Sequence, residues 1–401
     1  MYTFLNTKNY EDIMIIDSQF PQKTPLGFRN VEINEYFRKI ENLNSYAMYP
    51  MNPGSEAWFT HDYGVKKSEF DENRRGYLLS YPTYKKRIKY LDKEKKYKAK
   101  LAYSFFLAET YVLLPFFEKN KIPFVFVLYP GGSFGLNNKS SDAMLKKIFN
   151  SKYFRGVIVT QNITKDYIID KRLCLPRKVH YIYGGFVQFK KEDVLLKKYY
   201  RKDKKTFDIC FVAAKYSEGG IDKGYDTFIK IAKVLSRKTA DINFHVVGGF
   251  NEKDQDIKGM EDRIKFYGYQ QSDFLKQFYS KMDIFLAPNK PYKLYEGNFD
   301  GFPLGIDAAY CGVALFVADE LHMNDNYIDD KNIVIISQDV SKAVNKIMDY
   351  YENIDTFYSL LHRCQNKSQE LFDIDHQANQ RIDVFSKYTK IILTKPEEVK
   401  K

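Results

Sequence analysis

The most constraining feature of this sequence is a polar, glycine-containing loop enclosed by two short apolar runs. The runs, residues 283–288 and 314–319, are apolar except for one terminal aspartate each, which predicts two buried parallel strands. Residues 298–313 between them begin as an acidic glycine loop and continue with a helical pattern. Strand, loop, helix and strand in this order predict a βαβ unit, whose loop lies at the carboxyl edge of a parallel sheet. We therefore expect an α/β fold with a ligand site at that edge.

The chemistry of this loop suits a phosphorylated sugar ligand. Gly301 allows a ligand to approach the backbone closely, and a helix is expected over about 303–312. The amides of 302–305, except that of the proline, are then unpaired donors of the kind that bind phosphate. Asp300 lies beside them and suits sugar hydroxyl groups. The alternative is that Asp300 only caps an ordinary helix and Asp307 is an exposed acid on it.

A second junction carries two lysines between a strand and a helix. Residues 207–214 predict a buried strand, Lys215 follows it directly, and Lys223 with Gly224 precedes a helix that has apolar residues at core spacing. Two cations at this junction favour an anionic ligand, because the helix N-terminus also attracts anions. The alternative is that both are ordinary surface lysines among the 63 basic residues of the chain.

These two segments resemble the donor site of retaining nucleotide-sugar glycosyltransferases of GT-B architecture, in particular glycosyltransferase family 4 (glycosyl transferases group 1). Gly301-Phe302-Pro303-Leu304 and Cys311-Gly312 stand in the order of the family signature. Asp300 holds the place of the first glutamate, for which Glu296 is a rival. Asp307 keeps the register of the second acid counted back from Cys311-Gly312, although Ala308 holds the position eight residues after Asp300. Lys223-Gly224 matches the family's Lys-Gly pair, and Lys215 replaces its arginine.

The resemblance implies two Rossmann-like domains that face each other across a cleft. The expected acceptor domain spans residues 1–190, with the tail 373–401 as a candidate to complete it. The charge-rich linker covers 190–205, and the donor domain covers 206–372. Within the donor domain, the implied roles are as follows: Lys215 and Lys223 hold the donor diphosphate, Asp300 the sugar, Asp307 the ribose, and the strand-end residues Gly248 and Tyr269 the nucleobase pocket.

The first half of the chain resembles the family only in architecture. The loop after the first expected strand contains Gly27 and Arg29, which the resemblance makes candidates for holding acceptor or phosphate. The strand 123–129 ends at Tyr129 and leads to Gly131 and Gly132. Many family members have a histidine at this strand end, and this chain has none there. The missing histidine and the altered acid spacing favour one alternative, a catalytically silent GT-B partner of an active transferase.

Composition narrows the class of protein and its partners. The 401 residues carry a net charge of +12, which favours anionic partners. Residues 84–100 contain eight lysines and one arginine, and we interpret them as the solvated face of a long helix or as a basic surface for an anionic membrane or a charged glycan. The sequence shows no signal-peptide pattern and no uncharged apolar run of membrane length. The four cysteines lack metal-ligand spacing and resemble reduced core thiols, so we expect a cytoplasmic protein, peripheral on the inner membrane face.

The resemblance thus implies a glycosyltransferase that moves a hexosyl-type sugar from a UDP- or GDP-linked donor to a glycan or lipid-linked glycan with retention. The expected context is bacterial-type synthesis of surface polysaccharide or glycoconjugate. No metal or other cofactor is expected, because two lysines can neutralise the diphosphate. A basic nucleic-acid-binding protein is the other alternative, but no helix-turn-helix or RNA-recognition sequence is evident, so nucleic acid is not an expected partner. His245, which alternates within an expected strand, is interpreted as a core residue.

Overall fold

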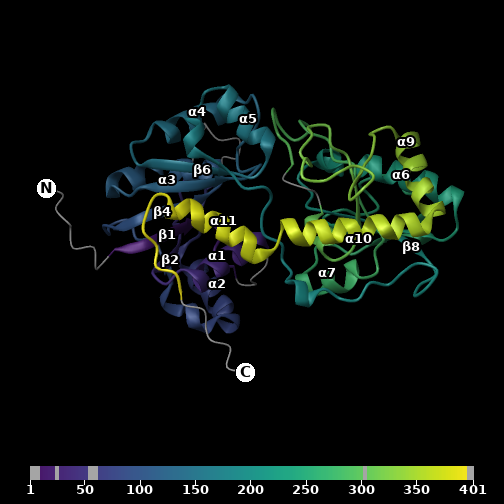
Figure 1. Ribbon diagram of the computed structural model, residues 1–401, viewed down its shortest axis with the longest axis horizontal. Helices are drawn as coiled ribbons and strands as arrows, with labels where there is room; N and C mark the ends of the chain where they lie inside the picture. Colours follow the sequence, from purple (N-terminus) through teal and green to yellow (C-terminus); the bar gives the residue numbers. More distant parts are fainter. Residues whose placement is uncertain (1–9, 23–26, 53–61, 301–304, 395–401) are drawn as a thin grey trace. The chain divides into compact units, whose positions relative to one another are not determined.

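The computed structural model describes residues 10–22, 27–52, 62–300 and 305–394, and it divides into two compact units. The first unit comprises Met1–Phe186 and Ile374–Lys401, and the second comprises Val187–Asp373. Each unit is an α/β structure built on one parallel sheet, which confirms the predicted fold class (Figure 1). The predicted loop residues Gly301, Phe302, Pro303 and Leu304 lie outside the described part of the chain.

The described part of the first unit contains a seven-stranded sheet in the order β3-β2-β1-β4-β5-β6-β7. Its strands are β1 (Glu11–Asp17), β2 (Leu43–Ala47), β3 (Ile88–Tyr90), β4 (Ala99–Phe105), β5 (Phe124–Leu128), β6 (Phe154–Val159) and β7 (Val179–Tyr181). Its helices are α1 (Phe28–Lys39), α2 (Lys67–Ser80), α3 (Leu107–Asn120), α4 (Lys139–Asn150), α5 (Asn162–Asp170) and α11 (Ile374–Ser386), with 3-10 helices η2 (Pro82–Lys86) and η3 (Pro176–Lys178).

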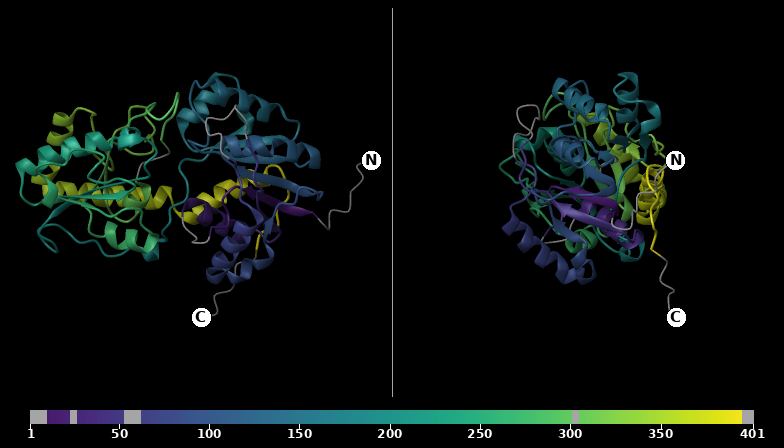
Figure 2. Two further views of the ribbon diagram at one scale, coloured as in Figure 1. Left: turned by 180° about the vertical axis from the view of Figure 1, so that it is seen from behind. Right: turned by 90° about the vertical axis from the view of Figure 1, so that its left-hand side faces the viewer.

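The strand order of this sheet reverses at β1, and the reversal distributes the helices over both faces. Connections from β1 run outward to β2 and β3, whereas those from β4 run in the opposite direction to β7. Right-handed crossovers therefore place α1 and α2 on one face and α3, α4 and α5 on the other, as Figures 1 and 2 show. The C-terminal helix α11 packs against α1. The carboxyl ends of β1, β4 and β5 consequently meet at one edge.

Two sequence-based expectations for this unit are wrong. The basic segment 84–100 is not a helix; it forms the end of η2, the three-residue edge strand β3 and the loop to β4. The apolar run 102–117 also predicts one buried helix from its sequence, but β4 ends at Phe105 and α3 begins at Leu107. Strand β4 lies between β1 and β5, and its apolar stretch 101–103 cannot be distinguished from a buried helix by periodicity.

The described part of the second unit contains a six-stranded parallel sheet in the order β10-β9-β8-β11-β12-β13. Its strands are β8 (Phe207–Ala213), β9 (Ile242–Gly248), β10 (Ile264–Phe266), β11 (Ile284–Ala287), β12 (Ala314–Val317) and β13 (Val334–Ile335). Its helices are α6 (Tyr225–Lys238), α7 (Ser272–Tyr279), α8 (Ile306–Tyr310), α9 (Val340–Glu352) and α10 (Ile354–Leu371), with η4 (Lys191–Asp193), η5 (Glu218–Lys223) and η6 (Glu261–Arg263).

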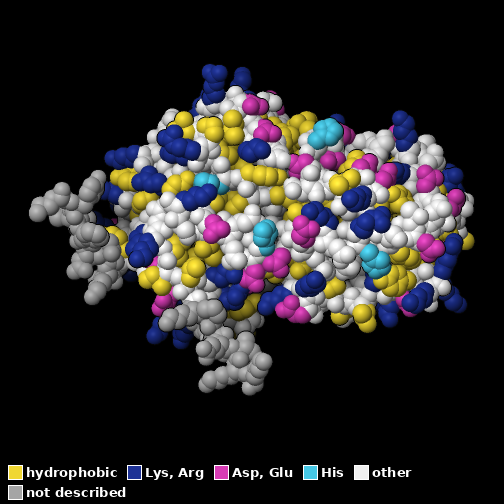
Figure 3. Space-filling view, viewed as in Figure 1, with side chains coloured by type: hydrophobic (Ala, Val, Ile, Leu, Met, Phe, Trp, Pro, Cys, Tyr) yellow, Lys and Arg dark blue, Asp and Glu magenta, His cyan; other side chains and the backbone are white. Residues whose placement is uncertain are grey.

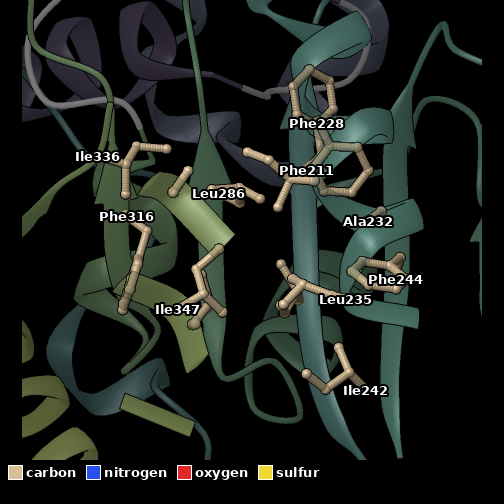
Figure 4. Close-up of a cluster of buried hydrophobic side chains, with 14 of the residues drawn as sticks. Phe211, Phe228, Ala232, Leu235, Ile242, Phe244, Leu286, Phe316, Ile336 and Ile347 are labelled. Carbon is tan, nitrogen blue, oxygen red and sulfur yellow. The ribbon is translucent and has the colours of Figure 1, made fainter. Parts of the chain in front are cut away.

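The core of this unit lies between the sheet and the helices α6 and α9. Figure 4 shows side chains from β8, β9, β11 and β12 in one cluster with those of α6 and α9, and the ring centroids of Phe211 and Phe228 are 5.1 Å apart. The predicted core positions of α6, including Phe228 and Leu235, are fully buried. The opposite face of the sheet carries α7, since the rings of His245 on β9 and Phe278 on α7 are 6.0 Å apart. The two faces thus separate an apolar core from a more polar layer.

The helix expected from residue 303 is shorter in the structure. Helix α8 covers Ile306–Tyr310, with Gly305 as its N-cap residue in the left-handed region at a φ of 75°. A Cβ at Gly305 would lie 2.5 Å from the Phe285 ring, so the close packing of this helix on β11 requires glycine. Among the described residues, no helix is long and apolar enough to cross a membrane. On the face shown in Figure 3, basic side chains are interspersed with acidic ones.

Candidate functional site

Glycine at the start of α6 brings the two predicted donor segments together. Gly224 has a φ of 68°, and a Cβ there would lie 1.8 Å from the carbonyl oxygen of Pro288. Any other residue would collide with the backbone that follows β11. The start of α6 therefore lies directly against the end of β11, and Lys223, one residue earlier, is placed beside the chain that leads to Asp300.

Lys223 and Asp300 form an ion pair at this carboxyl edge. The ammonium group of Lys223 contacts Oδ1 of Asp300, while Nδ2 of Asn289 donates to Oδ2 at 2.5 Å. The two charged side chains are only 13% and 15% exposed. Burial alone lowers the pKa of Lys223, but the adjacent Asp300 carboxylate more than compensates, so its pKa is raised and the lysine is firmly cationic. The Lys223 ammonium also lies 5.3 Å from the centre of the Tyr216 ring.

A small cavity opens beside this ion pair. Its volume is about 160 Å³, and it is lined by the ends of β8 and β11 together with Tyr216, Lys223, Asn289 and Gly305. Ligand sites for drug-sized molecules are typically about 300–1,000 Å³, so this volume suits one phosphate-sized group better than a whole nucleotide. The arrangement offers one lysine cation, one amide and one carboxylate to an anionic, hydroxyl-bearing ligand.

Lys215 belongs to a neighbouring group at the same edge. Its ammonium pairs with Oδ1 of Asp254 at 2.5 Å, and its backbone N–H donates to the Tyr269 hydroxyl at 3.5 Å. That hydroxyl would lie 2.8 Å from a Cβ at Gly249, next to Gly248 at the end of β9. The structure thus brings Lys215, Gly248 and Tyr269 together. Ala214 and Tyr216, the sequence neighbours of Lys215, line the 160 Å³ cavity. Lys215 itself is not among the described residues that line it.

Asp307 occupies a buried position with its own partner. The backbone N–H and the side-chain amide of Gln188 donate to its two carboxylate oxygens, each at 2.9 Å. Ser272 in turn donates to the Gln188 amide oxygen at 3.0 Å. Burial raises the pKa of Asp307, and the two hydrogen bonds from Gln188 oppose that rise. These contacts fix residue 188 against α8, a structural role that competes with the predicted ribose contact.

The rival first acid, Glu296, is exposed in the turn before Asp300. This turn is held by Asn298, whose side-chain oxygen accepts from the amides of Leu294 and Tyr295 at 2.9 and 3.3 Å. Of the two acids, Asp300 is therefore the one that the structure brings to Lys223.

In the first unit, Arg29 is bound by acidic partners. Gly27 precedes α1 with a φ of 80°, and Arg29 lies in the first turn of that helix. The guanidinium of Arg29 is 2.9 Å from Asp17 and 3.5 Å from Glu109, and it lies 4.6 Å from the centre of the Phe106 ring. Burial and the Asp17 charge raise the pKa of Glu109 to about 8, against the opposite effect of Arg29. The side chain of Arg29 is 15% exposed, so it is largely committed to this cluster.

Tyr129, the residue at the strand end where many family members have histidine, is also part of an internal network. It is 2% exposed and donates to Oε2 of Glu32 at 2.9 Å, while Arg381 of α11 lies 3.5 Å from its hydroxyl. Gly131 and Gly132 follow in the left-handed region, and a Cβ at Gly132 would lie 2.6 Å from the Phe106 side chain, whereas Gly131 faces open space. The structure therefore brings Gly131, but not the Tyr129 hydroxyl, to an open edge.

Sequence reasoning missed several residues of these clusters. Asn289 and Asp254 contact the predicted Asp300 and Lys215, and Asp17 and Glu109 contact Arg29. Asn289 and Asp17 end or follow expected strands, and this position at a parallel-sheet edge is the signal that could have found them. No group of three or more metal-ligating side chains is found within residues 10–22, 27–52, 62–300 and 305–394.

Solved structures share the fold of this chain. The TM-score is 0.65 with HepE from Anabaena in complex with UDP, at 13% identity and covering 94% of this chain and 100% of that one. It is 0.62 with sucrose-phosphate synthase from Thermosynechococcus elongatus, at 13% identity and covering 94% and 98% of the two chains. It is 0.61 with a glycosyltransferase from Rickettsia africae ESF-5, at 11% identity and covering 95% and 99%. The fold is therefore the GT-B fold of glycosyltransferases.

Sequence comparison identifies the family in the second unit. Residues 206–353, which contain both lysines, Asp300 and Asp307, match the family model "Glycosyl transferases group 1". The predicted family resemblance is thereby confirmed, and family and fold together support sugar transfer. Uncharacterized protein 356 of Sulfolobus islandicus rod-shaped virus 1 is 26% identical over 202 residues, which are 47% of this chain and 55% of that protein. The match thus spans about half the length of that relative.

Proposed function

We propose that this protein transfers a sugar from a nucleotide-diphosphate donor to a glycan or lipid-linked glycan, with retention of the anomeric configuration. The observation that carries the proposal is the Lys223–Asp300 pair beside a phosphate-sized cavity, inside the segment that matches the family. Both charges are held at the carboxyl edge of a parallel sheet, where open α/β sheets bind ligands. A bound UDP in the HepE structure supports UDP-sugars as the first donors to test.

Electrostatic stabilisation of the leaving group is the proposed source of catalysis. The bond between the anomeric carbon and the diphosphate oxygen breaks, and negative charge grows on the diphosphate. Lys223 is cationic, largely buried and already placed, so it can hold this charge without reorganisation. The acceptor oxygen bonds to the same face of the sugar, and its proton passes to the leaving phosphate.

Asp300 changes partner in this scheme. When a donor phosphate binds Lys223, the carboxylate is released toward sugar hydroxyl groups, while Asn289 continues to hold its Oδ2 atom. We expect Asp300→Asn to reduce turnover more than nucleotide affinity. Glu296→Gln is the matched control, because this exposed acid lies four residues earlier on the same turn. A larger defect in Glu296→Gln would transfer the sugar-binding role to that residue.

The direct test is turnover of a panel of UDP- and GDP-sugars, combined with thermal shift. A nucleotide at a hundred times its Kd stabilises the folded protein by about 2.7 kcal/mol, which a melting curve detects readily. The proposed chemistry assigns the charge-neutralising role to lysine, so turnover is expected to persist in a chelator. A nucleotide that stabilises the protein without any transfer or hydrolysis would favour the second candidate, a catalytically silent partner subunit. The commitment of Arg29 and Tyr129 to internal contacts is the observation that supports this alternative.

A membrane-linked acceptor is supported by a second basic region, in the first unit. A cavity of about 890 Å³ lies between α2, the edge strand β3 and the loop after it, and it is lined by five lysines and one arginine. Asp71 and Asp92 pair with two of these lysines, whereas Lys93 lies 4.5 Å from the centre of the Tyr49 ring. Each basic residue near an anionic membrane contributes about 1 kcal/mol. Salt-sensitive sedimentation with anionic vesicles, weakened in Lys66→Gln/Lys93→Gln, is the expected result; no sedimentation at low salt would refute this attachment.

A further inference from the structure

The second unit contains another cavity, away from the candidate donor site. Its volume is about 510 Å³, and it lies between α7 and the strands β8, β9 and β10. Asp208, Asn243 and Lys265 line it, and each is the second residue of its strand. The cavity of the candidate donor site is lined on β8 from Phe211, three residues further along the strand. At roughly 3.3 Å per residue, the nearest lining residues of the two cavities are about 10 Å apart along the sheet.

Three lysines around this cavity have no acidic partner in the described residues. Lys198, Lys265 and Lys281 are exposed and line the cavity, and no carboxylate of the described chain pairs with any of them. The fourth lysine, Lys204, is instead neutralised by Asp208 at 2.6 Å and by the buried Asp283. One exposed acid, Asp203, also lines the cavity, so the rim carries three unpaired lysines against one carboxylate, and this excess of positive charge favours an anionic ligand.

The acidic floor of the cavity is satisfied internally. Oδ2 of Asp208 accepts from Lys204 at 2.6 Å and from Thr206 at 3.0 Å, and Oδ1 is 2.8 Å from Nε2 of His245. The other ring nitrogen of His245 is 2.9 Å from the Tyr267 hydroxyl. His245 is thus a core residue, as predicted, and the network fixes the Tyr267 ring. Because Asp208 is fully paired, it does not oppose an anion at the rim.

An aromatic wall forms the side of the cavity next to the lysines. The ring centroids of Tyr267 are 5.4 Å from Phe274 and 5.5 Å from Phe278, and the two phenylalanines stack at 5.6 Å. Tyr267 and Phe274 are partly exposed, so a flat ring can pack on them. Asn243 and Gln277 add amide groups to the lining. The volume is within the usual range of about 300–1,000 Å³ for small-molecule sites.

We propose that this cavity binds a nucleoside phosphate at a second site, independent of the donor site. The unpaired lysines hold the phosphates, and the wall of Tyr267 and Phe274 stacks on the base. The proposal does not rest on sugar transfer, since none of these residues belongs to the donor site.

Calorimetric titration with ATP tests this site, and Lys223→Ala separates it from the donor site by removing the lysine of that site. One ATP per chain is expected to bind here with the same affinity in the wild type and in Lys223→Ala. Lys265→Gln/Lys281→Gln should weaken this event at least tenfold, whereas Lys253→Gln/Lys331→Gln, which removes two exposed lysines elsewhere in the unit, should leave it unchanged. Absence of an ATP event that survives Lys223→Ala, or equal loss in both double variants, would overturn the proposal.

Inorganic tripolyphosphate separates the lysines from the aromatic wall. We expect ATP to bind at least tenfold more tightly than tripolyphosphate, because only ATP can stack. Phe274→Ala should remove most of this difference and leave tripolyphosphate binding unchanged, with a melting curve to show that the variant is folded. Equal affinity of the two ligands in the wild type would refute the assignment to a nucleoside phosphate.

Discussion

The two sheets of this protein have the same parallel construction, yet their carboxyl edges hold charge in opposite ways. In the second unit, Lys223 and Asp300 pair with each other, Asn289 also donates to Asp300, and the two charged side chains are 13% and 15% exposed. In the first unit, Arg381 and Glu32 are fully buried, 3.6 Å apart, and surrounded by further hydrogen bonds. Glu32 alone accepts from three tyrosine hydroxyls, those of Tyr36, Tyr103 and Tyr129. A ligand can therefore displace a partner at the carboxyl edge of the second unit but not at that of the first unit.

This difference teaches that an edge position is not by itself a ligand site. Arg29 and Tyr129 occupy positions that the family resemblance assigns to ligand contact, and the structure surrounds them with internal partners. The C-terminal helix α11 contributes Arg381, so residues far apart in the sequence close this edge. The comparison therefore predicts that changes at the carboxyl edge of the first unit reduce stability, whereas changes at the carboxyl edge of the second unit reduce turnover.

The largest effect is expected from removing Arg381. Arg381→Met would leave the buried carboxyl group of Glu32 without its cation, and losing one partner of a buried pair costs about 3–5 kcal/mol of unfolding free energy. Urea unfolding followed by circular dichroism measures this loss. Glu32→Gln/Arg381→Met should regain part of it, because the remaining charge is also removed. A single variant within about 1 kcal/mol of wild type would break the comparison.

Lys223→Ala is expected to reduce turnover strongly and leave stability nearly unchanged, the reverse of Arg381→Met. Losing a charge contact made to the leaving group costs about 3 kcal/mol of transition-state stabilisation, or about a hundredfold in kcat. Its partner Asp300 is 15% exposed, and Asn289 still donates to it, so the urea midpoint should change little. Steady-state kinetics on the best donor measure the first quantity. Ordinary turnover in a folded Lys223→Ala variant would remove this edge from catalysis.

The sequence was informative where one physical signal dominated. Buried parallel strands such as β5, which is continuously apolar, and β8, which is apolar except for Asp208, are predicted within about a residue or two of their ends. The edge strand β3 lacks that signal, because it is three residues long and lies in a lysine-rich stretch, as edges often do. With the end of a 3-10 helix before it and a loop after it, this strand belongs to segment 84–100, for which the expectation of a helix is wrong.

The candidate site followed the same division. Lys223 and Asp300 are predictable because the strand–loop–helix pattern and the family signature place Lys223 just before a helix and Asp300 in the loop after a strand, and the structure brings them into contact. The hydrogen-bond partners of the predicted site residues are not predictable in this way, as Asp307 shows. Gln188 and Asp307 are 119 residues apart, and nothing local to either residue indicates that they meet. Hydrogen-bond partners across a fold depend on how the elements pack, which single-sequence patterns do not encode.

The pH dependence of stability tests whether the charged groups at the carboxyl edge of the first unit are held by internal partners. Burial and Asp17 raise the pKa of Glu109 to about 8, above its ordinary value of about 4.3 when unfolded. The folded state then holds one extra proton between these values, so this contribution to stability is complete at low pH and is lost as pH rises through 8. Glu109→Gln should flatten this dependence, so that between pH 5.5 and pH 8.5 the variant gains about 3 kcal/mol of unfolding free energy relative to the wild type. Parallel curves for the two proteins would show that Glu109 is not held protonated.

The smallest effect is expected from Asp307→Asn. This variant tests whether Asp307 serves the internal structure or contacts a ligand. The asparagine keeps one acceptor for Gln188 and loses the charge, so about 1 kcal/mol of unfolding free energy should be lost while the donor KM is unchanged. Gln188→Ala is the matched control, because it removes the side-chain amide donor and leaves the buried carboxylate with only the backbone N–H of residue 188, so it should destabilise at least as much. A ribose contact predicts a different split, in which Asp307→Asn raises the donor KM at least tenfold and Gln188→Ala does not. That result would return Asp307 to the ligand side and make the edge of the second unit catalytic at both of its acids.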